Sequence, residues 1–97
     1  MSAIVLVLLH GGDRDTLIGL VKKGKGFLGK GDAAVVRMAQ IYAGPDTGDL
    51  LVATRYSSFE AYGKAIGMLT KSDPFMKLMA QVSPFIANRV ILSDINL

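Results

Sequence analysis

The sequence predicts an α+β domain whose strands and helices follow the order β-α-β-β-α-β. Three observations predict it. The length of 97 residues fits one domain, apolar runs of strand length flank two stretches with helical spacing, and a turn rich in glycine and proline joins the middle runs. Two crossovers and one hairpin then place four strands in one antiparallel sheet, with both helices on one face. We expect residues 1–97 to form this single domain.

The first strand is expected at Ala3 to His10, an unbroken run of β-branched and leucine residues. Such a run is typical of a central strand that is buried on both faces. A helix follows, capped by Asp13 or Asp15 and ending near Lys30. The residues of its apolar face recur in steps of three and four: Leu17, Leu20, Val21, Gly24, Phe27, Leu28 and Gly31. Four glycines in the same segment disfavour a helix: Gly19, Gly24, Gly26 and Gly29.

A hairpin is expected next, with strands at Ala34 to Ala43 and Leu50 to Tyr56. The connecting residues 44–48, Gly-Pro-Asp-Thr-Gly, have the composition of a turn. If this turn is symmetric about Asp46, Arg37 and Arg55 face each other directly across the two strands.

The second helix is expected to begin at a capping box, in which Ser57 bonds the amide of Glu60. Its apolar stripe is interrupted at Ser72-Asp73-Pro74, where proline suits the first turn of a second helical piece. That piece ends near Ser83-Pro84, and the last strand is expected at Asn88 to Asp94. The apolar residues of the two pieces are Phe59, Tyr62, Ile66 and Leu69, followed by Phe75, Leu78, Met79 and Val82.

Composition narrows the class of protein. The chain has no cysteine, which excludes disulfides, thiolate metal sites and a cysteine nucleophile, and which fits a cytoplasmic location. A net charge of +3 does not indicate nucleic acid or an anionic membrane as partner. No apolar run reaches the length of about 20 residues that a transmembrane helix needs.

Hydrophobic residues make up 51% of the chain, which is high for a small domain. Helices cover only one face of the predicted sheet, and the strands are not cleanly polar on either face. Packing two such sheets face to face across a two-fold axis removes the second apolar face from water. The sequence therefore predicts a homodimer that associates through its sheet faces.

The order of elements is the ferredoxin-like one, and the chain resembles the dimeric α+β barrel superfamily over nearly its whole length. The segments that carry the resemblance are Tyr56 to Tyr62 and Ser72 to Phe75. The superfamily includes antibiotic-biosynthesis monooxygenases, haem-degrading relatives, stress-responsive barrels and polyketide cyclases. The monooxygenase-like members usually carry a tryptophan near the place of Tyr56, and this chain has none.

The resemblance implies a pocket for a small organic molecule in each subunit, with an apolar, aromatic, carbonyl-bearing or carboxylate-bearing ligand. It implies a monooxygenase, isomerase or cyclase that works without a bound metal or cofactor. The alternative is a non-catalytic dimer that binds a ligand or has a structural role. A shared fold does not decide between them.

His10 is the only histidine and lies where the first strand meets a loop, a usual place for functional residues. Histidine titrates near neutral pH, so His10 is a candidate general base for proton abstraction. The alternative is a loop histidine that caps a backbone group. One histidine without cysteine or a carboxylate cluster does not predict a metal site.

Arg37 and Arg55 are candidate ligands for an anion, since like charges that face each other across two strands are tolerated when an anion lies between them. The alternative is two separate surface or interface arginines. Gln40, Tyr42, Thr54 and Tyr56 share the other hairpin face, where Gln40, Tyr42 and Tyr56 are candidates for lining a pocket. The alternative there is an ordinary core with tyrosine hydroxyls at its edge.

Residues 24–29 match the dinucleotide-binding pattern G-x-G-x-x-G. That motif binds pyrophosphate only between a strand and the start of a helix, whereas here it follows a helical stripe. We therefore expect these glycines to let the helix pack closely on the sheet, and the nearby lysines to face solvent.

Overall fold

The computed structural model of the chain describes residues 2–30 and 35–93. Its elements follow the order βαββααβ, which confirms the predicted order with the second helix in two pieces. The strands are β1 (Ala3–Leu9), β2 (Val35–Gln40), β3 (Leu50–Tyr56) and β4 (Ile86–Ser93), and the helices are α1 (Arg14–Lys30), α2 (Phe59–Leu69), α3 (Asp73–Val82) and the short 3-10 helix η1 (Ser83–Phe85).

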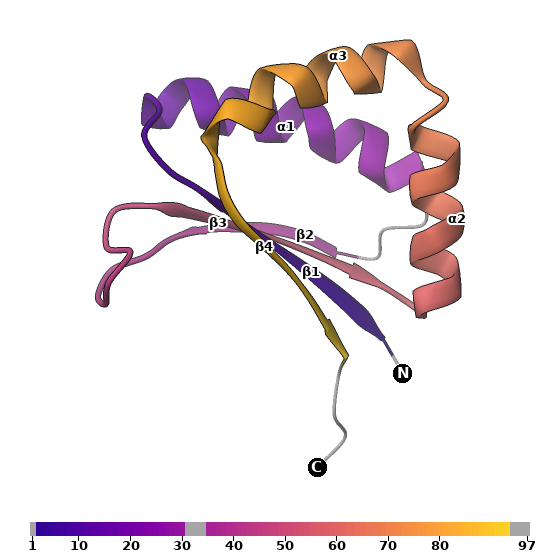
Figure 1. Cartoon of the computed structure of the whole chain (residues 1–97), viewed down its shortest axis with the longest axis horizontal. Coiled ribbons are helices and arrows are strands. Elements are labelled where there is room, and N and C mark those ends of the chain that lie inside the picture. Colours follow the sequence, from indigo (N-terminus) through magenta and orange to yellow (C-terminus); the bar gives the residue numbers. More distant parts are fainter. Residues whose placement is uncertain (1, 31–34, 94–97) are drawn as a thin grey trace.

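The four strands form one antiparallel sheet in the order β2-β3-β1-β4, so β1 and β3 are central. All three α-helices lie on one side of this sheet (Figure 1), with α1 and α3 side by side and α2 crossing near the end where β1 begins. The predicted arrangement of helices on one face is therefore confirmed. No helix in the described part of the chain is long and apolar enough to cross a membrane.

The core lies between the sheet and the helices and has two clusters. In the first, Ala3 and Val5 of β1 pack with Tyr56 of β3 and Ala65 of α2. In the second, Leu9 and Leu50 pack with Leu17 of α1. Because side chains alternate along a strand, the odd residues of β1 and the even residues of β3 face the helices.

The opposite sheet face has no helix over it (Figure 1). Its residues on β1, β3 and β4 are largely apolar, and Arg37 and Arg55 lie on the same face. In an isolated chain its side chains are half-buried or exposed, so the expectation that β1 is buried on both faces holds for one face only. We call this surface the open face; the paired registers place on it Ile4, Leu6, Leu8, Leu51, Ala53, Val90 and Leu92.

The hairpin register differs from the predicted one. Arg37 pairs with Ala53, and Arg55 pairs with Val35, so the direct opposition of the two arginines is wrong. The connection is centred one residue earlier than Asp46, because Ile41 exchanges backbone hydrogen bonds with Asp49 and Gly48. Gly44 and Gly48 both adopt positive φ, which lets the loop close there. Strand β2 therefore ends at Gln40 rather than at Ala43; Ala34 lies outside the described residues.

Helix starts confirm one predicted cap and correct another. Asp13 caps α1 by accepting a hydrogen bond from the amide of Thr16 at 3.0 Å. At α2 the cap is Ser58, not Ser57, since the Ser58 hydroxyl accepts from the amide of Ala61 at 3.0 Å. Helix α3 begins as expected, with Pro74 in its first turn and Ser72 as its cap.

Smaller differences concern strand ends and the glycines of α1. Strand β1 ends at Leu9, one residue before the predicted end, and β4 begins at Ile86, two residues before the predicted start. The glycines lie inside α1, away from any strand end, so they do not have the setting of a dinucleotide loop. A Cβ atom built on Gly24 lies 3.8 Å from Leu78, so this glycine approaches α3 rather than the sheet.

Candidate functional site

The candidate site lies between the sheet and α2, where Tyr56 ends β3. Tyr56 is 1% exposed and packs against Ala3, Val5 and Ala65. Its ring meets the ring of Tyr62 from α2 edge to face, with centroids 5.1 Å apart and planes at 66°. Aromatic pairs prefer this arrangement, which fixes the direction of both rings.

Arg89 of β4 completes the cluster, which we call the Tyr56–Tyr62–Arg89 site. Its register partner on β1 is Val7, a residue of the helix-facing side, so Arg89 faces α2. Its guanidinium donates a hydrogen bond to the hydroxyl of Tyr62. The three side chains pass from the core outward, since Tyr56 is buried, Tyr62 is half-buried and Arg89 is exposed.

The electrostatics of the site favour a neutral Tyr56 beside a cationic Arg89. Burial raises the pKa of Tyr56 above its ordinary value, Tyr62 raises it further, and Arg89 opposes the shift. Tyr56 therefore stays a neutral phenol at physiological pH. Because the Tyr62 hydroxyl accepts from Arg89, its own proton remains available to another acceptor.

This arrangement suits recognition of a ligand oxygen. The Arg89 guanidinium and the Tyr62 phenol supply hydrogen-bond donors at the boundary between the core and solvent, and the buried Tyr56 ring supplies apolar surface behind them. Donors held in place in this way stabilise negative charge on an enolate or phenolate oxygen. In the described residues no group of three histidine, aspartate or glutamate side chains is arranged to hold a metal ion.

Of the residues singled out from the sequence, only Tyr56 is in this site. Tyr62 was expected to pack on the helix stripe and Arg89 only to lie in the last strand. Their pairing was missed because it joins an α2 residue to a β4 residue and depends on which face Arg89 takes. Val7, the residue of β1 that pairs with Arg89, points to the helices, and this pairing is the signal that identifies the helix-facing direction of Arg89.

His10 lies at the other end of β1. The Nδ1 atom of His10 is 2.6 Å from Oδ1 of Asp49, and its backbone amide donates to the carbonyl of Phe85. Ala3, not His10, is the residue of β1 that pairs with Tyr56. At about 3.3 Å per residue, His10 and the Tyr56–Tyr62–Arg89 site lie roughly 20 Å apart along the strand.

The remaining candidates are spread over the sheet. Arg37 and Arg55 lie on the open face as diagonal neighbours, away from Tyr56, which points to the helices. Gln40 shares the helix-facing side with Thr54 and Tyr56, but it lies at the turn, where its amide donates to the carbonyl of Gly48 at 3.4 Å. Tyr42 lies beyond β2 and is 94% exposed. The structure does not bring these residues together into one site.

Known proteins were compared by sequence and by structure. No protein-family model matches the sequence, and no curated protein matches it significantly. Solved structures match nearly the whole chain. Rv0793 from Mycobacterium tuberculosis has a TM-score of 0.71 and 16% identity, over 100% of this chain and 98% of that one.

Two further structures extend the likeness. A NIPSNAP family protein from Agrobacterium tumefaciens has a TM-score of 0.77 and 14% identity, covering 99% of this chain and 95% of its own. SnoaB, a cofactor-independent oxygenase from Streptomyces nogalater, has a TM-score of 0.76 and 6% identity, covering 99% and 94%. At these identities the likeness concerns the fold. The chain therefore shares its fold with these proteins, and the ferredoxin-like α+β fold that its sequence predicts is confirmed.

Proposed function

We propose that this protein is a homodimer that binds a small aromatic or carbonyl-bearing molecule at the Tyr56–Tyr62–Arg89 site of each subunit and converts it without a cofactor. The observation that carries the proposal is the hydrogen bond from Arg89 to Tyr62 beside the buried Tyr56. A surface arginine with no ligand to serve gains little from being held against a tyrosine in this way. A ligand oxygen at this place would receive donors from both side chains.

The proposed reaction begins when the substrate loses a proton, from a carbon next to a carbonyl or from a phenol hydroxyl, to a water molecule, because Arg89 and the two neutral tyrosines are donors and not bases. The resulting enolate or phenolate is stabilised by Arg89 and by the neutral hydroxyls of Tyr62 and Tyr56. Oxygenation, isomerisation and cyclisation all proceed from such an anion. SnoaB is a cofactor-independent oxygenase, and its similar fold supports oxygenation as the first reaction to assay.

The homodimer part of the proposal rests on the open face. Leu6 and Leu8 at its centre are flanked by Ala53, Leu51 and Val90 of the neighbouring strands. Leaving this surface in water costs roughly 25 cal/mol for each Å² of apolar area. A second copy of the chain offers a matching apolar surface. We propose that this dimer is cytoplasmic, because a chain without cysteine needs no oxidising compartment for disulfides.

The test combines binding and turnover with two variants of the site. Purified protein is titrated with a panel of phenols and aromatic ketones while tyrosine fluorescence is followed, and oxygen uptake and product formation are then measured with each binder. We expect Tyr62→Phe and Arg89→Met to weaken binding and to lower turnover by about tenfold or more. Tyr42→Phe, which changes an exposed tyrosine outside the site, should leave both unchanged.

The outcomes separate the proposed enzyme from the alternatives. Binding without turnover of any binder would favour a non-catalytic ligand-binding dimer. If no compound binds, or if binding is unaffected in both site variants, the Tyr56–Tyr62–Arg89 site is wrong and a structural dimer is the better reading.

His10 is a second candidate base, because the contact with Asp49 involves its Nδ1 atom and leaves Nε2 for a substrate. We propose His10 as base for a substrate bound at its own end of the sheet, and, at separate places, Arg37 and Arg55 as anion ligands on the open face and Gln40 and Tyr42 as contacts near the hairpin turn. His10→Asn should then abolish turnover while Arg89→Met leaves it intact. The opposite pattern would assign the chemistry to the Tyr56–Tyr62–Arg89 site.

A further inference from the structure

A groove runs between α1 and α3 and is independent of the proposed active site. Its volume is about 390 Å³, within the range of about 300–1,000 Å³ that small ligands occupy. Lys23 and Phe27 of α1 line one side of the groove, and four residues of α3 line the other: Pro74, Lys77, Leu78 and Gln81. Gln81 lies at one end.

The floor of the groove is apolar and fixed. Leu78 is 6% exposed and lies against α1 beside Gly24, where a built Cβ atom would be in ordinary van der Waals contact with it at 3.8 Å. The ring of Phe27 meets Phe75 edge to face, with centroids 5.8 Å apart. Because neighbours hold Leu78 and Phe27 in place, the groove presents an ordered apolar surface without a ligand.

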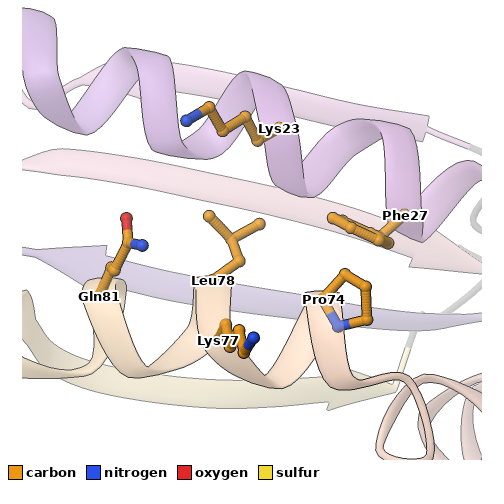
Figure 2. Close-up of a pocket in the computed structure, with 6 residues that line it drawn as sticks. All are labelled: Lys23, Phe27, Pro74, Lys77, Leu78 and Gln81. Carbon is orange, nitrogen blue, oxygen red and sulfur yellow. The ribbon is translucent and has the colours of Figure 1, made fainter.

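The polar groups are not spread evenly along the groove. Figure 2 shows the Lys23 ammonium and the Gln81 amide toward one end and Phe27 and Pro74 toward the other, with Leu78 between them. Lys77 lies on the α3 side. The groove therefore has a cationic, hydrogen-bonding end and an apolar end.

The surrounding charges strengthen this polarity. Helix α1 has no acidic residue after Asp15, so no carboxylate of this helix lies beside Lys23. The acidic residue of α3, Asp73, precedes Pro74 and thus lies at the apolar end. An anion is therefore attracted to the Lys23 end and repelled from the Pro74 end.

We propose that this groove binds a small soluble amphiphilic carboxylate. Its carboxylate pairs with Lys23 and accepts from the amide of Gln81, Lys77 adds positive charge from the α3 side, and its hydrocarbon part lies over Leu78 toward Phe27 and Pro74. A neutral apolar molecule leaves the lysines unused, and an inorganic anion leaves the apolar floor in water. The segregated lining matches a molecule that has both parts.

Octanoate is the probe, and amide NMR is the measurement. We expect saturable shifts that are confined to α1 and α3 and that octanol reproduces only weakly. Lys23→Gln and Lys77→Gln should each weaken octanoate binding about two- to fivefold, as expected for exposed charge pairs. Lys25→Gln is the matched control, because it removes the same charge from the same helix outside the groove lining, and it should leave the affinity unchanged.

Arg89→Met separates this site from the proposed active site, since it should leave the α1 and α3 shifts intact. Equal weakening by Lys25→Gln and Lys23→Gln would show unspecific charge attraction and overturn the proposal. So would octanoate shifts centred on the open face, or binding of anionic phospholipid vesicles with no response to octanoate. Circular dichroism of each variant verifies that it is folded.

Discussion

At the scale of single residues, Tyr56 predicts how the stability of the protein depends on pH. Burial raises its pKa in the folded protein, so the folded state favours the neutral phenol. Its contribution to stability is complete below the unfolded-state pKa of about 10 and is lost as pH rises through the higher folded-state pKa. We expect the free energy of unfolding to fall above about pH 10, and urea denaturation at stepped alkaline pH measures the fall.

The Tyr56→Phe variant should lack this part of the alkaline fall, because phenylalanine has no proton to lose. Tyr42→Phe is the matched control, because Tyr42 is 94% exposed. The free energy of unfolding of this variant should fall with pH as that of the unchanged protein does. An alkaline fall of equal size in both variants would contradict the assignment to Tyr56.

The candidate site also shows which residues sequence reasoning can reach. Tyr56 is a candidate because hairpin pairing places it on one face with Gln40, Tyr42 and Thr54, where polar atoms among apolar ones suit a pocket. Arg89 is not, because its role depends on the direction of an edge-strand side chain. The hairpin register failed for a related reason: two residues with positive φ, Gly44 and Gly48, move the centre of the turn, and composition alone does not fix such a shift.

At the scale of elements, the order and extent of helices and strands followed from hydrophobic periodicity and turn residues. The break at Ser72 to Pro74 separated α2 from α3 because proline fixes the start of a helix. The first residue of α2 does not follow from the sequence in this way, because the neighbouring Ser57 and Ser58 offer the same capping hydroxyl. The α2 cap illustrates this: the structure selects Ser58, and the sequence had favoured Ser57.

This choice between two serines predicts unequal losses of stability for two similar variants. Ser58→Ala removes the acceptor of the Ala61 amide and should cost about 1 kcal/mol of folding free energy. Ser57→Ala changes an exposed side chain that does not cap the helix and should cost much less. Urea denaturation at neutral pH measures both, and a larger loss for Ser57→Ala would restore the original cap.

At the scale of the whole molecule, the open face decides the assembly. An apolar surface across β1, β3 and β4 is an unusual exterior for a stable monomer. Stable interfaces bury about 800 Å² on each partner, which is comparable to one face of a small sheet. In the proposed dimer, association through this face would leave the helices outside, so the Tyr56–Tyr62–Arg89 site and the groove between α1 and α3 would both stay accessible.

Leu6 tests this assembly, because it lies on the central strand between Ala53 and Val90. Native mass spectrometry should give twice the chain mass of 10.3 kDa for the unchanged protein. Leu6→Glu buries a charge at the centre of the interface and should give the single-chain mass. Tyr42→Glu adds the same charge at an exposed turn and should remain a dimer. A monomeric unchanged protein would remove the dimer, whereas a dimeric Leu6→Glu variant would place the interface on another surface and leave the open face without a partner.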